Sequence, residues 1–156
     1  MIDGINHLTS LTADMDRLIA FYQRVFDARV TLDLEEEELR HVFIQLGPNT
    51  VLHPFQVPGV DVPQGKMPMF GRGRLDHFAV NAASEADFYE IRRRVVELRA
   101  GDGLMADMGP ALNFSYEDPD GAEHEVVWTR PDADFGEALK REDWTRYPYP
   151  KRPEAR

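Results

Sequence analysis

Two stretches of the chain place hydrophobic residues at the spacing of an amphipathic helix, and each follows a short segment of alternating polar and apolar residues. Asp14 is a good N-cap for the first stretch. Ser84, with Asp87 three residues later, resembles a capping box before the second. Each helix is therefore predicted to bury one face. The buried positions are expected to be Met15, Leu18, Ile19, Tyr22, Val25 and Phe26 in the first helix and Phe88, Ile91, Val95 and Leu98 in the second.

After each predicted helix, three apolar segments with turn residues between them indicate three strands. The turn GPN separates the last two strands of the first set, and DPDG separates the last two of the second set. Both halves of the chain are therefore predicted to follow the order β-α-β-β-β. The expected strands after the helices are 28–34, 40–46, 50–57, 104–108, 112–117 and 122–129.

The two halves also align with each other. Residues 5–29 match 75–99 without a gap, so that His7 falls on His77, and each histidine lies seven positions before its capping residue. We therefore expect one domain over 1–130, made of two repeated modules and followed by a C-terminal extension. The expected boundaries are module one at 3–57, a Gly- and Pro-rich linker at 58–74, module two at 75–130 and the extension at 131–156, with a short helix within 131–144 and an extended tail after it.

Composition narrows the chemistry. The chain has no cysteine, so any metal site must use histidine and carboxylate ligands. The formal net charge is −10, which disfavours nucleic acid as a partner. No apolar run is long enough for a membrane span, and the start of the chain lacks the pattern of a signal peptide. We expect a cytoplasmic protein with no membrane partner.

The alternation of side chains between the two faces of each predicted strand indicates a candidate metal site. His7 and His77 occupy equivalent positions in the repeat, while Glu125 lies in the last strand of the second half. If the two halves form one curved sheet, these residues and His53 are expected on its concave face, since side chains two apart share a face. Two or three imidazoles with one carboxylate are typical ligands of a divalent metal.

The remaining histidines are expected outside this site. His41 stands at the start of a predicted strand and has no partner in the repeat, so we expect it at the surface. His124 faces the opposite side of the last strand from Glu125, where it is expected to make a half-buried polar contact. The ligand role of His53 stays open, because Pro54 follows it and three protein ligands suffice for a catalytic metal.

At these positions the sequence resembles the vicinal oxygen chelate superfamily, which includes glyoxalase I, fosfomycin-resistance enzymes, extradiol dioxygenases and bleomycin-binding proteins. The resemblance is carried by INHLTSLTADMDRLIAFYQRVFD, RLDHFAV and DPDGAEHEVV. It implies an α+β fold in which two β-α-β-β-β modules form an incomplete, curved mixed barrel around a metal. It also implies that His7, His77 and Glu125 are ligands, with His53 at the position where glyoxalase I-like members usually place a glutamate.

The resemblance implies a divalent-metal-dependent lyase, isomerase or oxygenase, which binds two adjacent oxygens of a small oxygenated substrate to one Ni, Co, Zn, Mn or Fe(II) ion. Glu125 and His53 are the candidate proton-transfer residues. Ring cleavage is disfavoured because extradiol dioxygenases place a tyrosine ten positions before the glutamate ligand, where this chain has Ser115. The predicted substrate pocket consists of Thr9, Phe55, Ala79, Phe114 and Tyr116.

A second class of function stays open at this point. Bleomycin-binding members of the superfamily sequester an antibiotic and generally lack the metal ligands, and the acidic charge of this chain would suit a cationic ligand. The presence of a bound divalent metal separates the two classes. The resemblance also implies a homodimer, and some members exchange modules between the two chains.

Overall fold

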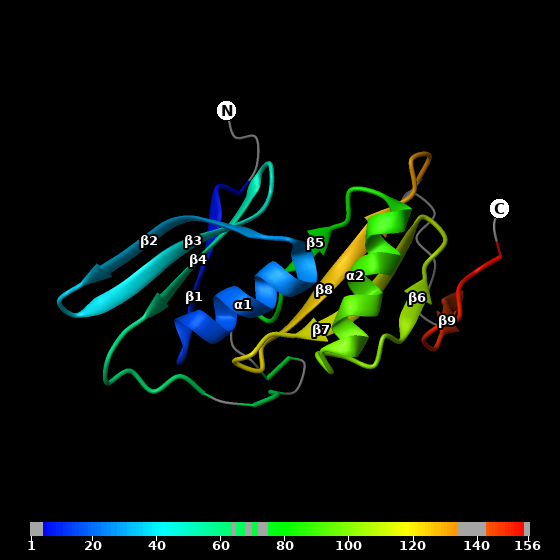
Figure 1. The fold of residues 1–156 in the computed structure, drawn as a ribbon. Helices are drawn as coiled ribbons and strands as arrows, with labels where there is room; N and C mark the ends of the chain where they lie inside the picture. Colours follow the sequence, from blue (N-terminus) through cyan, green and yellow to red (C-terminus); the bar gives the residue numbers. More distant parts are fainter. Residues whose placement is uncertain (1–4, 64, 68–69, 72–74, 134–142, 155–156) are drawn as a thin grey trace. The chain divides into compact units, whose positions relative to one another are not determined.

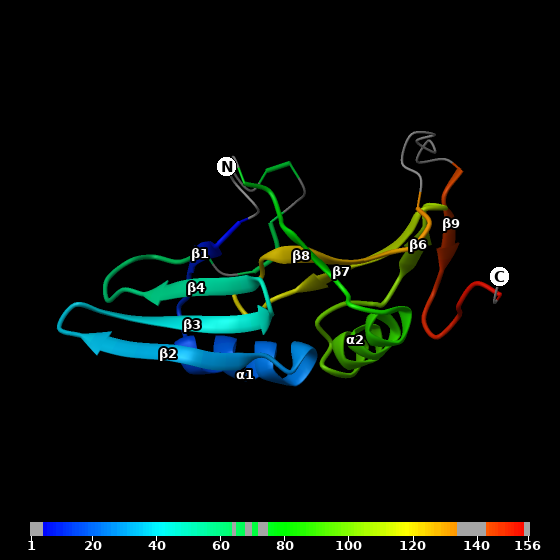
Figure 2. The same cartoon turned by 90° about the horizontal axis from the view of Figure 1, so that it is seen from above.

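The computed structural model describes residues 5–63, 65–67, 70–71, 75–133 and 143–154. The chain divides into two compact units, Met1–Gly65 and Lys66–Arg156. Each unit is a mixed β-sheet with one helix along one of its faces (Figures 1 and 2). The predicted α+β class is confirmed.

The first unit follows the predicted β-α-β-β-β order. Its sheet has the strand order β1-β4-β3-β2, in which β1 runs parallel to β4 and the other neighbours are antiparallel. His7 is the first residue of β1. The elements are β1 (His7–Leu11), α1 (Met15–Phe26), β2 (Arg29–Glu36), β3 (Leu39–Gly47) and β4 (Thr50–Gln56).

Helix α1 begins and packs as its sequence predicts. The Asp14 side chain accepts a hydrogen bond from the Arg17 backbone N–H at 3.0 Å, and the helix ends at Asp27, whose φ of 53° is left-handed. The helix contacts β3 and β4, where every second residue is buried. This burial of alternate strand residues leaves the other face of the sheet open. The core consists of Met15, Leu18, Tyr22 and Val25 from α1 and of Val42, Ile44 and Leu52 from the sheet.

The second unit repeats this arrangement and adds one strand. Its sheet has the order β5-β8-β7-β6-β9, with β5 parallel to β8. The Ser84 hydroxyl accepts a hydrogen bond from the Asp87 backbone N–H at 3.1 Å, as the capping pattern predicts. The strand expected around His77 begins only at Ala79. The elements are β5 (Ala79–Asn81), α2 (Glu85–Glu97), β6 (Met105–Asp107), β7 (Ala111–Glu117), β8 (Glu123–Thr129) and β9 (Thr145–Tyr147).

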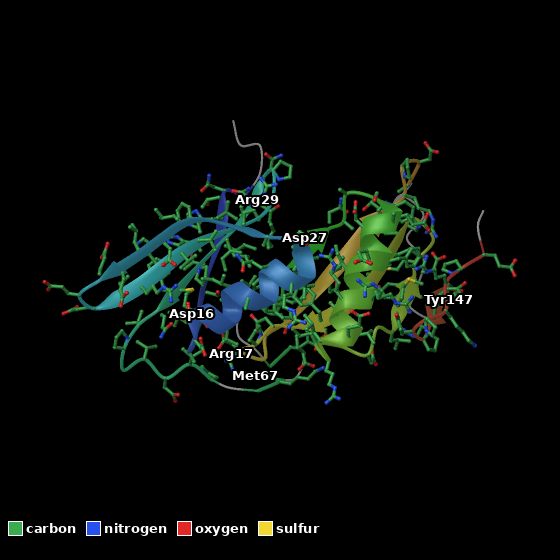
Figure 3. All side chains as sticks on the ribbon, viewed as in Figure 1. Asp16, Arg17, Asp27, Arg29, Met67 and Tyr147 are labelled. Atoms are coloured by element: carbon green, nitrogen blue, oxygen red, sulfur yellow. The ribbon has the colours of Figure 1, made fainter. Side chains whose placement is uncertain are left out.

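The C-terminal extension is part of the second sheet, although an extended tail was expected. Strand β9 pairs antiparallel with β6 and ends at Tyr147 (Figure 3). Arg92 of α2 is 1% exposed and donates hydrogen bonds to the carbonyls of Gly103, Tyr147 and Lys151 at 2.7, 2.6 and 2.7 Å. The short helix expected within 131–144 falls mainly on 134–142, outside the described residues. Two backbone carbonyls of the extension are thus held by one buried side chain.

In the part of the chain that the structure describes, neither helix is long and apolar enough to cross a membrane.

Candidate metal centre

His7 and His53 lie beside each other on the open face of the first sheet. Parallel pairing of β1 with β4 sets Thr9 opposite His53, and the His7 and His53 ring centroids are 5.3 Å apart. The alternation of side chains predicts this shared face. Two of the four predicted ligands are therefore brought together within one unit.

His41 joins this pair, so its expected surface position is wrong. Its Nδ1 lies 2.9 Å from Nε2 of His53, and only 16% of its side chain is exposed. The cause is strand register: β3 pairs with β4 so that His41 stands opposite Phe55, which places it on the same open face as His53. In the predicted strand His41 lies two residues before Phe43, so the two side chains share a face. This spacing is the sequence signal from which the position of His41 could have been predicted.

Aromatic rings enclose the three histidines. The His53 ring centroid lies 4.5 Å from that of Phe43 and 4.4 Å from that of Phe55. Burial by these neighbours lowers the pKa of His53 from its ordinary value, and the positive charge that His41 and His7 can carry lowers it further. The lowered pKa favours the neutral form of His53, which is the form that binds metals or accepts a proton.

We expect the His53 imidazole to titrate below pH 6.5 in the metal-free protein. Since its pKa is lower in the folded state than in the unfolded state, stability is retained above the unfolded pKa and falls as the pH drops through both values. NMR titration of the histidine side chains measures the midpoint directly. His53→Asn should show a smaller loss of stability over the same pH range, and a midpoint at or above 6.5 would contradict the prediction.

In the second unit, the pairing of β8 with β5 positions Glu125. Glu125 pairs with Ala79, and its backbone N–H donates to the carbonyl of Phe78 at 3.0 Å. The Asn113 amide donates to Oε1 of Glu125 at 3.4 Å. Glu125 therefore lies on the open face of the second sheet, with His77 two residues before its strand partner.

Hydrogen bonds to Nδ1 determine which nitrogen of His77 and His7 is free to bind a metal. Nδ1 of His77 lies 2.8 Å from the Asp76 carboxylate, and Nδ1 of His7 lies 2.8 Å from the amide oxygen of Asn6. Both oxygens are acceptors, so each Nδ1 carries the proton and each Nε2 keeps its lone pair. The backbone N–H of Phe70 donates to the other oxygen of Asp76 at 2.6 Å. A carboxylate or amide behind each imidazole is the usual environment of a metal-binding histidine, so these side chains fit a divalent metal.

Each unit taken alone holds only part of the predicted ligand set. Within the described residues of either unit, no three His, Asp or Glu side chains are arranged as a complete metal site. His7 and His53 belong to the first unit and His77 and Glu125 to the second. The predicted ligand set is therefore divided between the two units.

Two residues expected in the substrate pocket lie in the core instead. Phe114 is 2% exposed and packs edge-on against Phe88 of α2 at 5.0 Å, and Tyr116 is 1% exposed. The reason is parity: β7 sets Ser115 opposite Glu125, so Phe114 and Tyr116 point to the helix-covered face.

The other three predicted pocket residues remain on the open faces. Ala79 and Thr9 are exposed, and Phe55 stacks on His41 at a centroid distance of 5.2 Å. His124 faces the helix side as expected, where it is buried and stacks on Phe78 at 3.8 Å.

Two β-α-β-β-β units, each with a helix on one face of the sheet and candidate ligands on the other, define the glyoxalase-like fold. The model of the Glyoxalase/Bleomycin resistance protein/Dioxygenase superfamily matches residues 4–126. The chain belongs to this superfamily. No curated protein matches the chain, and residues 127–156 lie beyond the match to the family model.

Solved structures with the same fold share little sequence with this chain. A glyoxylase/bleomycin resistance protein/dioxygenase domain from Frankia sp. EAN1pec is 15% identical, with 83% of this chain and 100% of that chain covered and a TM-score of 0.71. A mutant of the fosfomycin resistance protein FosX from Listeria monocytogenes, complexed with Mn(II) and 1S,2S-dihydroxypropylphosphonic acid, is 18% identical over 85% and 97% of the two chains, with a TM-score of 0.61. FosX from Mesorhizobium loti is 24% identical over 81% and 91%, with a TM-score of 0.55.

Proposed function

We propose that this protein is a divalent-metal-dependent lyase, isomerase or oxygenase that acts on a small oxygenated substrate. The observation that carries the proposal is the acceptor oxygen 2.8 Å from Nδ1 of both His7 and His77, which favours a proton on Nδ1 and leaves Nε2 of both repeat-equivalent histidines available to a metal. The proposed ligands are His7, His77 and Glu125, with His53 as a fourth. The proposal holds whether the units that share an ion belong to one chain or to two copies, and a homodimer stays a prediction.

A divalent ion held by imidazole and carboxylate supplies Lewis acidity toward two adjacent oxygens of a substrate. The chain itself supplies orientation and proton transfer. Asn113 holds one oxygen of Glu125, which leaves the other oxygen of the carboxylate available. Burial lowers the pKa of His53 and so favours its neutral form, which can accept a proton if three other ligands hold the metal.

The substrate is proposed to lie against the exposed side chains of the open faces. Thr9 and Phe55 adjoin His53 on the first sheet, and Ala79 pairs with Glu125 on the second. The FosX complex with Mn(II) and a dihydroxypropylphosphonic acid supports a small substrate with neighbouring oxygens, as an analogy from a distant relative.

Asp76→Asn is expected to weaken metal binding by about 10- to 100-fold, the usual effect of changing an outer partner of a metal-binding histidine. The amide removes the carboxylate charge that favours a proton on Nδ1 of His77 while preserving the size of the side chain. Titration calorimetry with Mn(II), Ni(II) and Zn(II) measures the change. The matched control is Asp132→Asn, an exposed aspartate of the same unit, which should bind like the wild type.

The metal content of the purified protein tests the proposal as a whole. Roughly one divalent ion per chain is expected from a site with three or four protein ligands. A protein that is purified without metal, and takes up none of the three ions, would contradict the enzyme function. That result would favour a protein that sequesters a cationic antibiotic or metabolite.

A further inference from the structure

Three polar side chains of the first unit lie in a row that ends at His53, joined by one hydrogen bond and one longer electrostatic contact. Nε2 of His53 lies 2.9 Å from Nδ1 of His41, and Nε2 of His41 lies 3.7 Å from the Glu36 carboxylate. Glu36 is the last residue of β2, so strands β2, β3 and β4 each contribute one member. We refer to these residues as the Glu36–His41–His53 chain.

The hydrogen bond between the two rings admits two arrangements of the proton. Either His41 Nδ1–H donates to His53, or His53 Nε2–H donates to His41, because a neutral imidazole carries one donor and one acceptor. The choice decides what the second nitrogen of His53 can do. In the first arrangement Nδ1 of His53 is a donor, whereas in the second it has a free lone pair.

Glu36 breaks this symmetry. Its carboxylate is only an acceptor and lies near Nε2 of His41, at a distance too long for a direct hydrogen bond but short enough for its charge to favour a proton on that nitrogen. A neutral His41 that is protonated on Nε2 has a lone pair on Nδ1. That lone pair can only accept, so the hydrogen must come from Nε2 of His53.

We propose that Glu36 and His41 are positioning residues that hold His53 in the Nε2–H tautomer, so that Nδ1 of His53 is the atom offered to the metal or to a substrate proton. The use of Nδ1 in this way rests on the proposed function, but the tautomer itself does not. His41 acts through His53 and is not itself a ligand in this proposal.

The surroundings of His53 leave the choice of its tautomer to His41. Phe43 and Phe55 pack against its ring, and phenylalanine side chains offer no hydrogen bond that would select one nitrogen. Of the described groups around His53, only His41 forms a hydrogen bond with its ring nitrogens. Loss of His41 should therefore leave the two tautomers of His53 close in energy.

Nitrogen-15 NMR of the metal-free protein tests the proposal at about pH 8, well above the ordinary histidine pKa of about 6.5. The wild-type protein is expected to show His53 with its proton on Nε2 and a lone pair on Nδ1. A proton on Nδ1, or a comparable mixture of the two forms, would overturn the proposal.

Variants identify the residues responsible. His41→Leu should convert the single form of His53 into a mixture of both. His41→Asp replaces the imidazole with a carboxylate, which can only accept a hydrogen bond, and should therefore retain the Nε2–H form of His53. Glu36→Gln should admit the second form, whereas Glu38→Gln, which removes the same charge from the following turn, should not. A single Nε2–H form that persists in His41→Leu, or an unchanged form in Glu36→Gln, would overturn the roles assigned to those residues.

Titration of the same wild-type sample with Mn(II), Ni(II) and Zn(II) separates the two proposals. The expected tautomer in a protein that binds no divalent ion would reject the metal-dependent function and leave the tautomer intact. Metal binding by a protein with the proton on Nδ1 of His53 would reject the inference and leave the function intact.

Discussion

His77→Ala is expected to abolish stoichiometric binding of a divalent ion. The imidazole is one of at most four protein ligands in the proposed site, and the Asp76 carboxylate behind it would have no ring to orient. The loss should exceed the roughly 10- to 100-fold that follows removal of an outer partner. Activity toward any substrate that depends on the metal should disappear with it.

Equilibrium dialysis followed by elemental analysis measures the remaining metal. His124→Gln is the matched control, because it also removes a histidine of the second unit but on the opposite side of strand β8 from Glu125. The control should retain its metal at temperatures where it stays folded. A His77→Ala protein that binds the ion as the wild type does would remove His77 from the ligand set.

Arg92→Met is expected to lower the free energy of unfolding by roughly 3–5 kcal/mol, because three backbone carbonyls lose their donor and each unsatisfied buried acceptor costs about 1–3 kcal/mol. Arg92 is almost fully buried and its described hydrogen bonds go to backbone carbonyls. Burial lowers its pKa from the ordinary value. Methionine fills a similar volume but leaves the carbonyls of Gly103, Tyr147 and Lys151 without their donor.

Chemical denaturation measures the change, and hydrogen exchange locates it. Arg92 donates to carbonyls on both sides of Pro148, those of Tyr147 and Lys151, and so holds the extension in place. Without it, the hydrogen exchange of amides in β6 and β9 should accelerate. The control is Arg93→Met, since Arg93 is 44% exposed and pairs with Glu90 and Glu97 at the surface of α2; it should cost less than about 1 kcal/mol. Equal losses in the two variants would show that Arg92 makes no special contribution.

The sequence contained most of the fold because its local signals agree with one another. Asp14 and Ser84 are N-caps in the structure as predicted, and the buried residues of α1 follow the predicted stripe. Strand β5 begins at Ala79, later than the predicted strand around His77, whereas the ends of the strands predicted after the helices differ from the observed ones by at most two residues, which is the usual spread at element termini. The C-terminal strand was missed because β9 has only three residues and its partners, strand β6 and the Arg92 side chain, are distant in sequence.

The candidate site was predicted less completely, and the reason is register. Parity within one strand placed His7, His53 and Glu125 on open faces, but parity alone does not say which residues of neighbouring strands stand opposite each other. His41 meets His53 only because of how β3 pairs with β4. The same gap explains Phe114 and Tyr116, whose aromatic character suggested a pocket while their register with β8 places them in the core.

Strand β9 also affects what the second sheet can join. The outer backbone groups of β6 are bonded to β9, a strand of the same chain, and an unpaired strand at that position would be a template for another chain. The extension lies beyond the region shared with the superfamily model. Strand β9 therefore occupies the position at which a strand of another chain could add to β6. Among the described residues, the edge strands of this sheet are β5 and β9.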